Sequence, residues 1–122
     1  MDEIDTIRLS QTAKDQLLKL KRLTGIEHWN ILCRWALMTS LAENDPPAPV
    51  AIPADSNVEM SWKVFAGEYQ ETISSLISLR MKEWNISEHS YEMREFFRGN
   101  LHRGIAHLAA LKGSVKEIVE RH

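Results

Sequence analysis

The chain has 122 residues, of which 43% are hydrophobic and 26% are charged, and its formal net charge is −2. This length predicts one domain with a single hydrophobic core. No apolar run approaches the roughly 18 to 20 residues that span a bilayer, and the acidic start of the chain lacks the features of a secretory signal. We therefore expect a soluble cytoplasmic protein without membrane contact. Cys33 is the only cysteine, which excludes an internal disulfide and a cysteine-rich zinc site.

The first predicted element is a short strand within residues 4–10. Hydrophobic and polar residues alternate there, which is the period-2 pattern of a half-buried strand. The alternation places two side chains against the core, Ile7 and Leu9. It directs three others outward, which are Thr6, Arg8 and Ser10.

Two helices are predicted next, over residues 11–24 and 28–44. Apolar residues recur at helical spacing in the first, Ser10 can cap its start, and Gly25 can take the positive φ that ends it. The second helix is apolar on most sides, which is typical of a helix buried between partners. Its breadth indicates a subunit interface.

The middle of the chain is predicted to be a connector. Four prolines between residues 44 and 54 exclude a helix or a central strand there, because proline fixes φ and removes a backbone donor. Residues 57–65 alternate in hydrophobicity and are interpreted as one strand or extended segment. Helical stripes then predict two more helices, over residues 69–85 and 90–110, and a short helix after Gly113.

Together these elements predict a mainly α protein with a short N-terminal strand. The order of strand, helix and helix in the N-terminal half is that of ribbon-helix-helix proteins, in which paired strands of two subunits enter the major groove of DNA. We expect an oligomer whose subunit is a single domain over residues 1–122. Its parts are the strand-helix-helix part (1–45), the Pro-rich connector with the extended segment (46–66) and the helical part (67–122).

Positive charge is concentrated near the N-terminus despite the acidic total. Between Thr6 and Ala36, six lysines and arginines against two acidic residues leave a local charge of +4. Cations of this kind bind nucleic acid by neutralising phosphates and releasing counterions, which requires little sequence information. Five residues are therefore the predicted DNA-binding residues: Arg8, Lys14, Lys19, Lys21 and Arg22. The alternatives are a solvated helix face and a strand with an incidental arginine.

No motif in the sequence predicts catalysis. The five histidines lack the spacing that puts two metal ligands on one side of a helix, and the five glycines are isolated, so no phosphate-binding loop is present. The pair Arg98 and His102 has some likeness to the Arg-His pairs of nucleases, but its surroundings fit a packed helical turn equally well. Cys33 is expected to be a buried thiol. We therefore expect no enzymatic activity, no catalytic residue, no metal and no cofactor.

The four tryptophans permit a base-stacking hypothesis, although core filling is the commoner role of such residues. Each of them falls within an apolar stretch or a helical stripe, so we expect core filling. Trp29 is the exception that stays open, because it lies beside His28 near a predicted helix N-terminus, where backbone donors can receive a phosphate.

Several separated blocks of the chain resemble the DndE family of bacterial DNA sulfur modification (phosphorothioation) proteins. They are residues 7–26, His28 to Ala36, Ser40 to Glu43, and Leu101 to Ile105 followed by Leu108. The resemblance implies a subunit of the machinery that replaces a non-bridging phosphate oxygen of DNA by sulfur. Its partners would be a cysteine desulfurase, a sulfotransferase-like iron–sulfur protein and an ATPase.

The resemblance also implies a homotetramer that binds double-stranded DNA, notably nicked duplex, through lysine-rich surfaces, without performing the sulfur chemistry itself. Two alternatives remain. One is a ribbon-helix-helix transcriptional regulator, which would prefer a palindromic operator and lose that preference without Arg8. The other is a structural adaptor of the modification complex that does not bind DNA.

Overall fold

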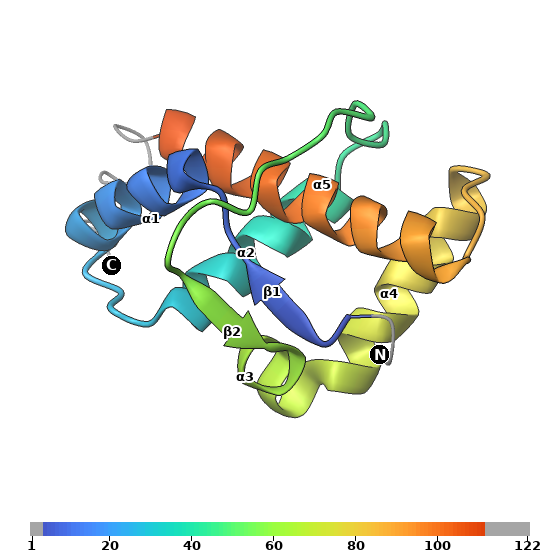
Figure 1. Ribbon diagram of the computed structural model, residues 1–122, viewed down its shortest axis with the longest axis horizontal. Helices are drawn as coiled ribbons and strands as arrows, with labels where there is room; N and C mark the ends of the chain where they lie inside the picture. The colour runs from blue at the N-terminus through green and yellow to red at the C-terminus, as the bar shows by residue number, and fades with distance from the viewer. Residues whose placement is uncertain (1–3, 112–122) are drawn as a thin grey trace.

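The computed structural model describes residues 4–111, so the helix expected after Gly113 lies outside the described residues. In Figure 1, α5 extends along the long axis of the molecule, α1 lies beside its C-terminal half and α4 lies near its N-terminal end. The predicted mainly α fold is thus confirmed. The elements in chain order are β1 (Thr6–Arg8), α1 (Gln11–Thr24), α2 (Trp29–Leu41), β2 (Glu59–Ser61), α3 (Trp62–Ala66), the 3-10 turn η1 (Gly67–Tyr69), α4 (Gln70–Glu83) and α5 (Ser90–Ala110).

Helix α1 begins and ends where the local sequence predicts. The Ser10 hydroxyl oxygen accepts a hydrogen bond from the Ala13 amide at 3.0 Å, which satisfies one of the free donors of the first turn. At the other end, Gly25 adopts a φ of 75° and its amide donates to the Lys21 carbonyl. A residue with a Cβ would be strained in that conformation.

The centre of the molecule is the crossing of α2 and α5. The backbones approach so closely that a Cβ added at Gly104 would lie 1.8 Å from the carbonyl oxygen of Ala36, so only glycine fits. Beside this contact, the fully buried Ser40 hydroxyl donates to the Asn100 side-chain oxygen at 2.8 Å. Buried residues from both strands and from α1 to α5 form one hydrophobic cluster around the crossing.

Strand β1 pairs within its own chain. It runs antiparallel to β2, with Ile7 opposite Met60 on the buried side. On the other edge of β1, the Arg98 guanidinium from α5 donates to the Arg8 carbonyl at 2.5 Å. Ribbon-helix-helix proteins instead pair this strand with that of a second subunit. The strand-helix-helix order is therefore present, while the two-subunit ribbon expected from it is replaced by an intramolecular one.

Two sequence-based expectations are wrong at particular residues. Residues 57–65 do not form one strand, because the Ser61 hydroxyl accepts from the Val64 amide at 3.1 Å and caps α3 after three strand residues. Ser10 does not point outward with Thr6 and Arg8, since its side chain turns to cap α1 and is only 6% exposed. In both places a serine cap ends the strand pattern.

The tryptophans differ in burial. Trp62 is buried and packs near Phe65 and Phe97, with ring centroids 5.6 and 5.9 Å away. Trp29 and Trp84 are partly buried against the core. Trp35 is 51% exposed on the outer face of α2, so core filling is the wrong explanation for it. None of the described helices is long and apolar enough to cross a membrane.

Candidate nucleic-acid interface

Arg8 lies on the outer face of the β1–β2 ribbon, as predicted. Its guanidinium pairs with the Glu59 carboxylate of β2 at 2.8 Å and donates to the Ser56 carbonyl at 3.3 Å. The side chains of the pair are 44% and 45% exposed. Exposed pairs of this kind contribute at most about 1 kcal/mol, so Arg8 can exchange its partner for a phosphate at low cost, but Glu59 reduces the positive potential of the ribbon.

Lys14 and Lys21 form one row on α1, because residues two turns apart share a side of a helix. The Lys14 ammonium donates to the Asn57 side-chain oxygen at 2.6 Å, just before β2. The Lys21 ammonium lies 4.3 Å from the centroid of the Trp29 ring at the start of α2. These partners are uncharged, so the contacts position both lysines without offering a counter-charge. We call these two residues the inner row.

Lys19 and Arg22 lie on the adjacent stripe of α1, together with Asp15. Arg22 is exposed and Lys19 is partly buried. The Asp15 carboxylate accepts a hydrogen bond from the Gln11 side chain at 3.0 Å. We call Lys19 and Arg22 the outer row. The fold thus brings four of the predicted residues onto one helix.

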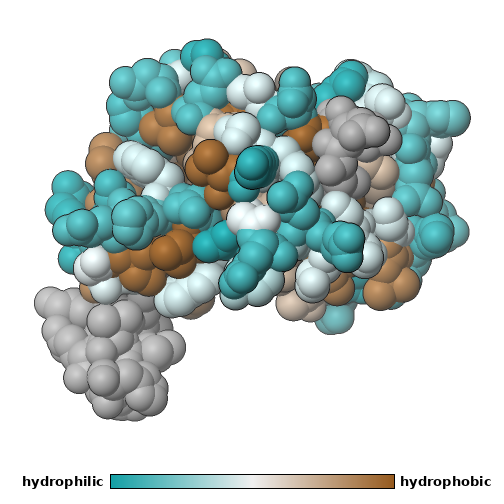
Figure 2. Space-filling model, turned by 90° about the horizontal axis from the view of Figure 1, so that it is seen from below, coloured by the Kyte–Doolittle hydropathy of each residue, from teal (hydrophilic) through white to brown (hydrophobic). Residues whose placement is uncertain are grey.

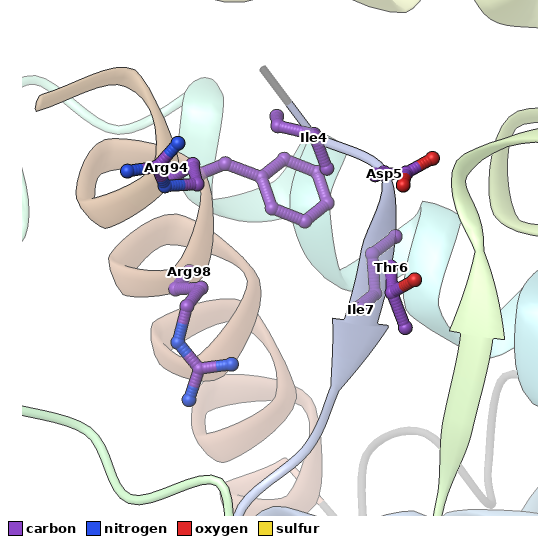
Figure 3. Close-up of a pocket in the computed structure, with 7 residues that line it drawn as sticks. Ile4, Asp5, Thr6, Ile7, Arg94 and Arg98 are labelled. Atoms are coloured by element: carbon purple, nitrogen blue, oxygen red, sulfur yellow. The ribbon is translucent and has the colours of Figure 1, made fainter. Parts of the chain in front are cut away.

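Two arginines next to β1 were missing from the predicted interface. Figure 3 shows Arg94 and Arg98, one turn apart on α5, beside Ile4, Asp5 and Thr6, around a cavity of about 50 Å³. Arg98 is engaged within the fold, since it donates to the carbonyls of Arg8, Ile52 and Pro53. Arg94 is exposed. The spacing of four residues between these arginines was the available signal, but nothing in the sequence placed them near β1.

His102 belongs to the same junction of α5 with the N-terminal elements. The Ser10 amide donates to its Nε2 atom at 3.2 Å, which makes Nε2 an acceptor, so Nδ1 carries the proton and donates to the Arg98 carbonyl at 2.8 Å. Burial lowers the pKa of His102 to about 4; the hydrogen bond to the Arg98 carbonyl opposes this shift and the Arg98 charge adds to it. Nε2 thus holds α5 against the start of α1, while Nδ1 bonds within α5, an arrangement that fits the packed helical turn. Elsewhere, burial raises the pKa of the Cys33 thiol to about 12.

The comparison with known families gives the context for these cations. The family described as "DNA sulphur modification protein DndE" matches residues 6–116. The chain belongs to the DndE family. Membership of DndE implies involvement in DNA phosphorothioation.

Solved structures of DndE proteins have the same fold. A crystal structure of DndE from Escherichia coli B7A, described as involved in DNA phosphorothioation modification, matches with a TM-score of 0.72 and 23% identity. A DndE G21/24K mutant, also described as involved in DNA phosphorothioation, matches with a TM-score of 0.64 and 21% identity. Each match covers 85% of this chain and 95% of the other. No curated protein sequence matches the chain.

Proposed function

We propose that this chain is a DNA-binding accessory subunit of the phosphorothioation machinery, without enzymatic activity of its own, that acts in the cytoplasm on duplex and nicked DNA. The observation that carries the proposal is the presence, in a DndE family member, of two cation rows on α1 beside the ribbon that holds Arg8. Contacts of this kind go to phosphates, so the surface supplies affinity and orientation more than sequence preference. The sulfur chemistry then falls to its partners, a sulfotransferase-like iron–sulfur protein and an ATPase.

The two rows can be tested separately by charge reversal. One variant combines Lys14→Glu with Lys21→Glu, the second combines Lys19→Glu with Arg22→Glu, and Lys82→Glu at an exposed site on α4 is a single-site control for charge reversal away from α1. Gel shifts with intact and nicked duplex of one sequence should show weaker binding for the row that contacts DNA. The slope of log affinity against log salt should also become shallower by about 0.9 for each lost phosphate contact.

Two outcomes would contradict the assignment. If both double variants bind DNA as tightly as the parent, α1 is not the interface. If the parent itself binds no DNA at physiological salt but still co-purifies with the ATPase or the sulfotransferase-like protein, the chain is an adaptor. The Arg8–Glu59 pair and the net charge of −2 favour this second candidate, because both weaken the attraction of phosphates.

We further propose that the chain works as a homo-oligomer, a tetramer, whose copies meet through the outer face of α2. Ile31, Trp35 and Met38 occupy this face at helical spacing and line a groove of about 600 Å³ that also includes Tyr69. Trp35 and Tyr69 are 51% and 49% exposed. An assembly would cover this apolar surface and bring several copies of the basic α1 together, which offsets the acidic total of a single chain.

The oligomer proposal has its own test, which is the native mass of purified protein. Trp35→Lys should yield a smaller species, whereas Leu79→Lys should leave the mass unchanged, because Leu79 is equally exposed on α4 but lies outside the groove. A Trp35→Lys variant that remains as large as the parent would remove α2 from the subunit contact. Figure 2 shows one face of the molecule, where apolar side chains form separate patches among hydrophilic ones. Because apolar side chains are exposed at several places, the Leu79→Lys control is needed to show that a change in native mass is specific to the groove on α2.

A further inference from the structure

A second groove lies between the Pro-rich connector and the first half of α5. Its volume is about 530 Å³, and connector residues 46–51 form one wall while Ile86, Tyr91 and Phe96 form the other. Val50 and Tyr91, on opposite walls, are each 64% exposed. The volume falls within the range of roughly 300 to 1,000 Å³ that is typical of ligand sites in proteins.

The groove is held open by contacts at both ends of the connector. At its start, the Arg103 guanidinium of α5 donates to the Asp45 carbonyl at 2.8 Å. At its far end, Arg98 donates to the Ile52 and Pro53 carbonyls at 3.0 Å. Two helical arginines therefore fix the connector on either side of the wall, and a binding segment would find this wall already formed, which lowers the entropic cost of binding.

The floor is also closely packed. A Cβ added at Gly99 on α5 would lie 3.1 Å from Pro47, so the connector touches the helix backbone there without an intervening side chain. Because prolines have no amide hydrogen, three of the six wall residues, Pro46, Pro47 and Pro49, offer only carbonyl oxygens as hydrogen-bonding backbone groups. The wall thus favours an occupant that donates hydrogen bonds.

The charged side chains that line the groove are acidic. Among the described residues they are Glu92 and Glu95, while the Arg98 and Arg103 guanidiniums at its two ends are occupied by connector carbonyls. The connector lies within residues 35–62, a stretch with four acidic residues and no lysine or arginine. This distribution is opposite to that of α1, so the groove repels phosphates and attracts cations.

We propose that this groove binds a segment of another protein in which apolar side chains alternate with lysine or arginine. Apolar side chains of the segment would pack between Val50 and Tyr91 and against Phe96, and its cations would pair with Glu92 and Glu95. Because the groove repels phosphates while α1 attracts them, the subunit can hold a basic protein segment and DNA on different surfaces. The proposal does not depend on DNA binding by α1.

The test uses short capped peptides and an ¹⁵N-labelled full-length chain. The probe is a peptide in which leucine and arginine alternate, compared with a leucine–glutamate peptide and a serine–arginine peptide of equal length. The leucine–arginine peptide should shift the amide resonances of the connector and of the first half of α5, and it should bind at least about tenfold more tightly than either comparison peptide. Equal affinity for the serine–arginine peptide, or shifts confined to other surfaces, would overturn the proposal.

Variants separate the contribution of the acidic side chains to peptide binding from the contribution of the apolar contacts. Glu92→Lys combined with Glu95→Lys should weaken peptide binding at least about tenfold, and Tyr91→Ser should weaken it without changing any charge. Glu68→Lys combined with Glu71→Lys, at exposed sites at and just before the start of α4, is the charge-matched control and should bind as the parent does. All of these residues are exposed, so dispersed spectra are expected for every variant.

Two other occupants would also overturn the proposal. If the Glu92→Lys and Glu95→Lys variant has a smaller native mass than the parent in the absence of peptide, the groove is a contact between copies of this chain. If duplex DNA shifts the same connector resonances, the groove is part of a nucleic-acid surface. Loss of DNA binding in the α1 variants with peptide binding retained would leave this inference intact and would refute only the proposed DNA interface.

Discussion

Acid should destabilise the fold through His102. In the folded protein this ring is neutral, because Nε2 accepts from the Ser10 amide and cannot do so once it carries a proton. Its folded pKa of about 4 lies below the ordinary value of 6.5, so the unfolded chain binds the proton more tightly. The stability that this ring contributes is therefore complete above pH 6.5 and falls as the pH drops toward 4.

The size of the effect follows from the two pKa values. The full difference corresponds to about 3 kcal/mol at about 1.4 kcal/mol for each pKa unit. At pH 5 the unfolded ring is almost fully protonated and the folded ring is not, which corresponds to a loss of about 2 kcal/mol relative to pH 7.5. The charge that acts on the ring is that of Arg98 on α5, which disfavours protonation. Asp55 lines the same pocket as His102 and accepts from the Gln11 amide.

Urea unfolding at pH 7.5 and pH 5 measures this loss directly. Because carboxylates also titrate in this range, the useful quantity is the difference between the parent and His102→Gln, which has no proton to gain. The parent should lose about 2 kcal/mol more than the variant between the two pH values. Equal losses, or an NMR titration that places the His102 pKa near 6.5, would refute the argument.

Three further substitutions test other contacts. Gly104→Ala should lower the free energy of unfolding by at least about 3 kcal/mol in urea, because its methyl group meets the immovable Ala36 carbonyl; an unchanged midpoint would contradict the close crossing of α2 and α5. Glu59→Gln should tighten DNA binding severalfold in gel shifts by releasing Arg8, whereas no change would place the ribbon away from DNA. Ser10→Ala should lower the thermal midpoint, at a cost of about 1 kcal/mol for the lost cap, and a fully retained midpoint would show that the cap is dispensable.

The helices could be predicted where their signals are local. Helix α1 has its cap and its terminal glycine within the sequence that forms it, and the predicted ends agree with the structure. Helix α3 was missed, because the hydrophobic alternation before it continues through Trp62 and Val64, while a single hydrogen bond from the Val64 amide to Ser61 converts the backbone to a helix. Alternation alone does not distinguish a strand from a capped turn that buries the same residues.

The candidate interface was also predictable only in part, namely where its residues lie on one helix. Lys14 and Lys21 belong to one helix, so their common side follows from its periodicity. The partner of Arg8 did not follow, since Glu59 is 51 residues away in sequence. Exposure of Trp35 was also out of reach, because an apolar residue on an apolar helix gives no sign of which side lacks a neighbour.

The intramolecular ribbon has a consequence for the order in which the chain acquires its structure during synthesis. Strand β1 emerges from the ribosome before β2 and has no partner until β2 appears, and the Arg98 guanidinium that meets its other edge is 90 residues downstream of Arg8. Such distant pairings form late, because the intervening loop must be closed before they contribute any stability. A nascent chain therefore exposes one edge of β1 until β2 has been translated and the other edge until α5 has been translated, and a chain that stops before α5 lacks the contact to the Arg8 carbonyl.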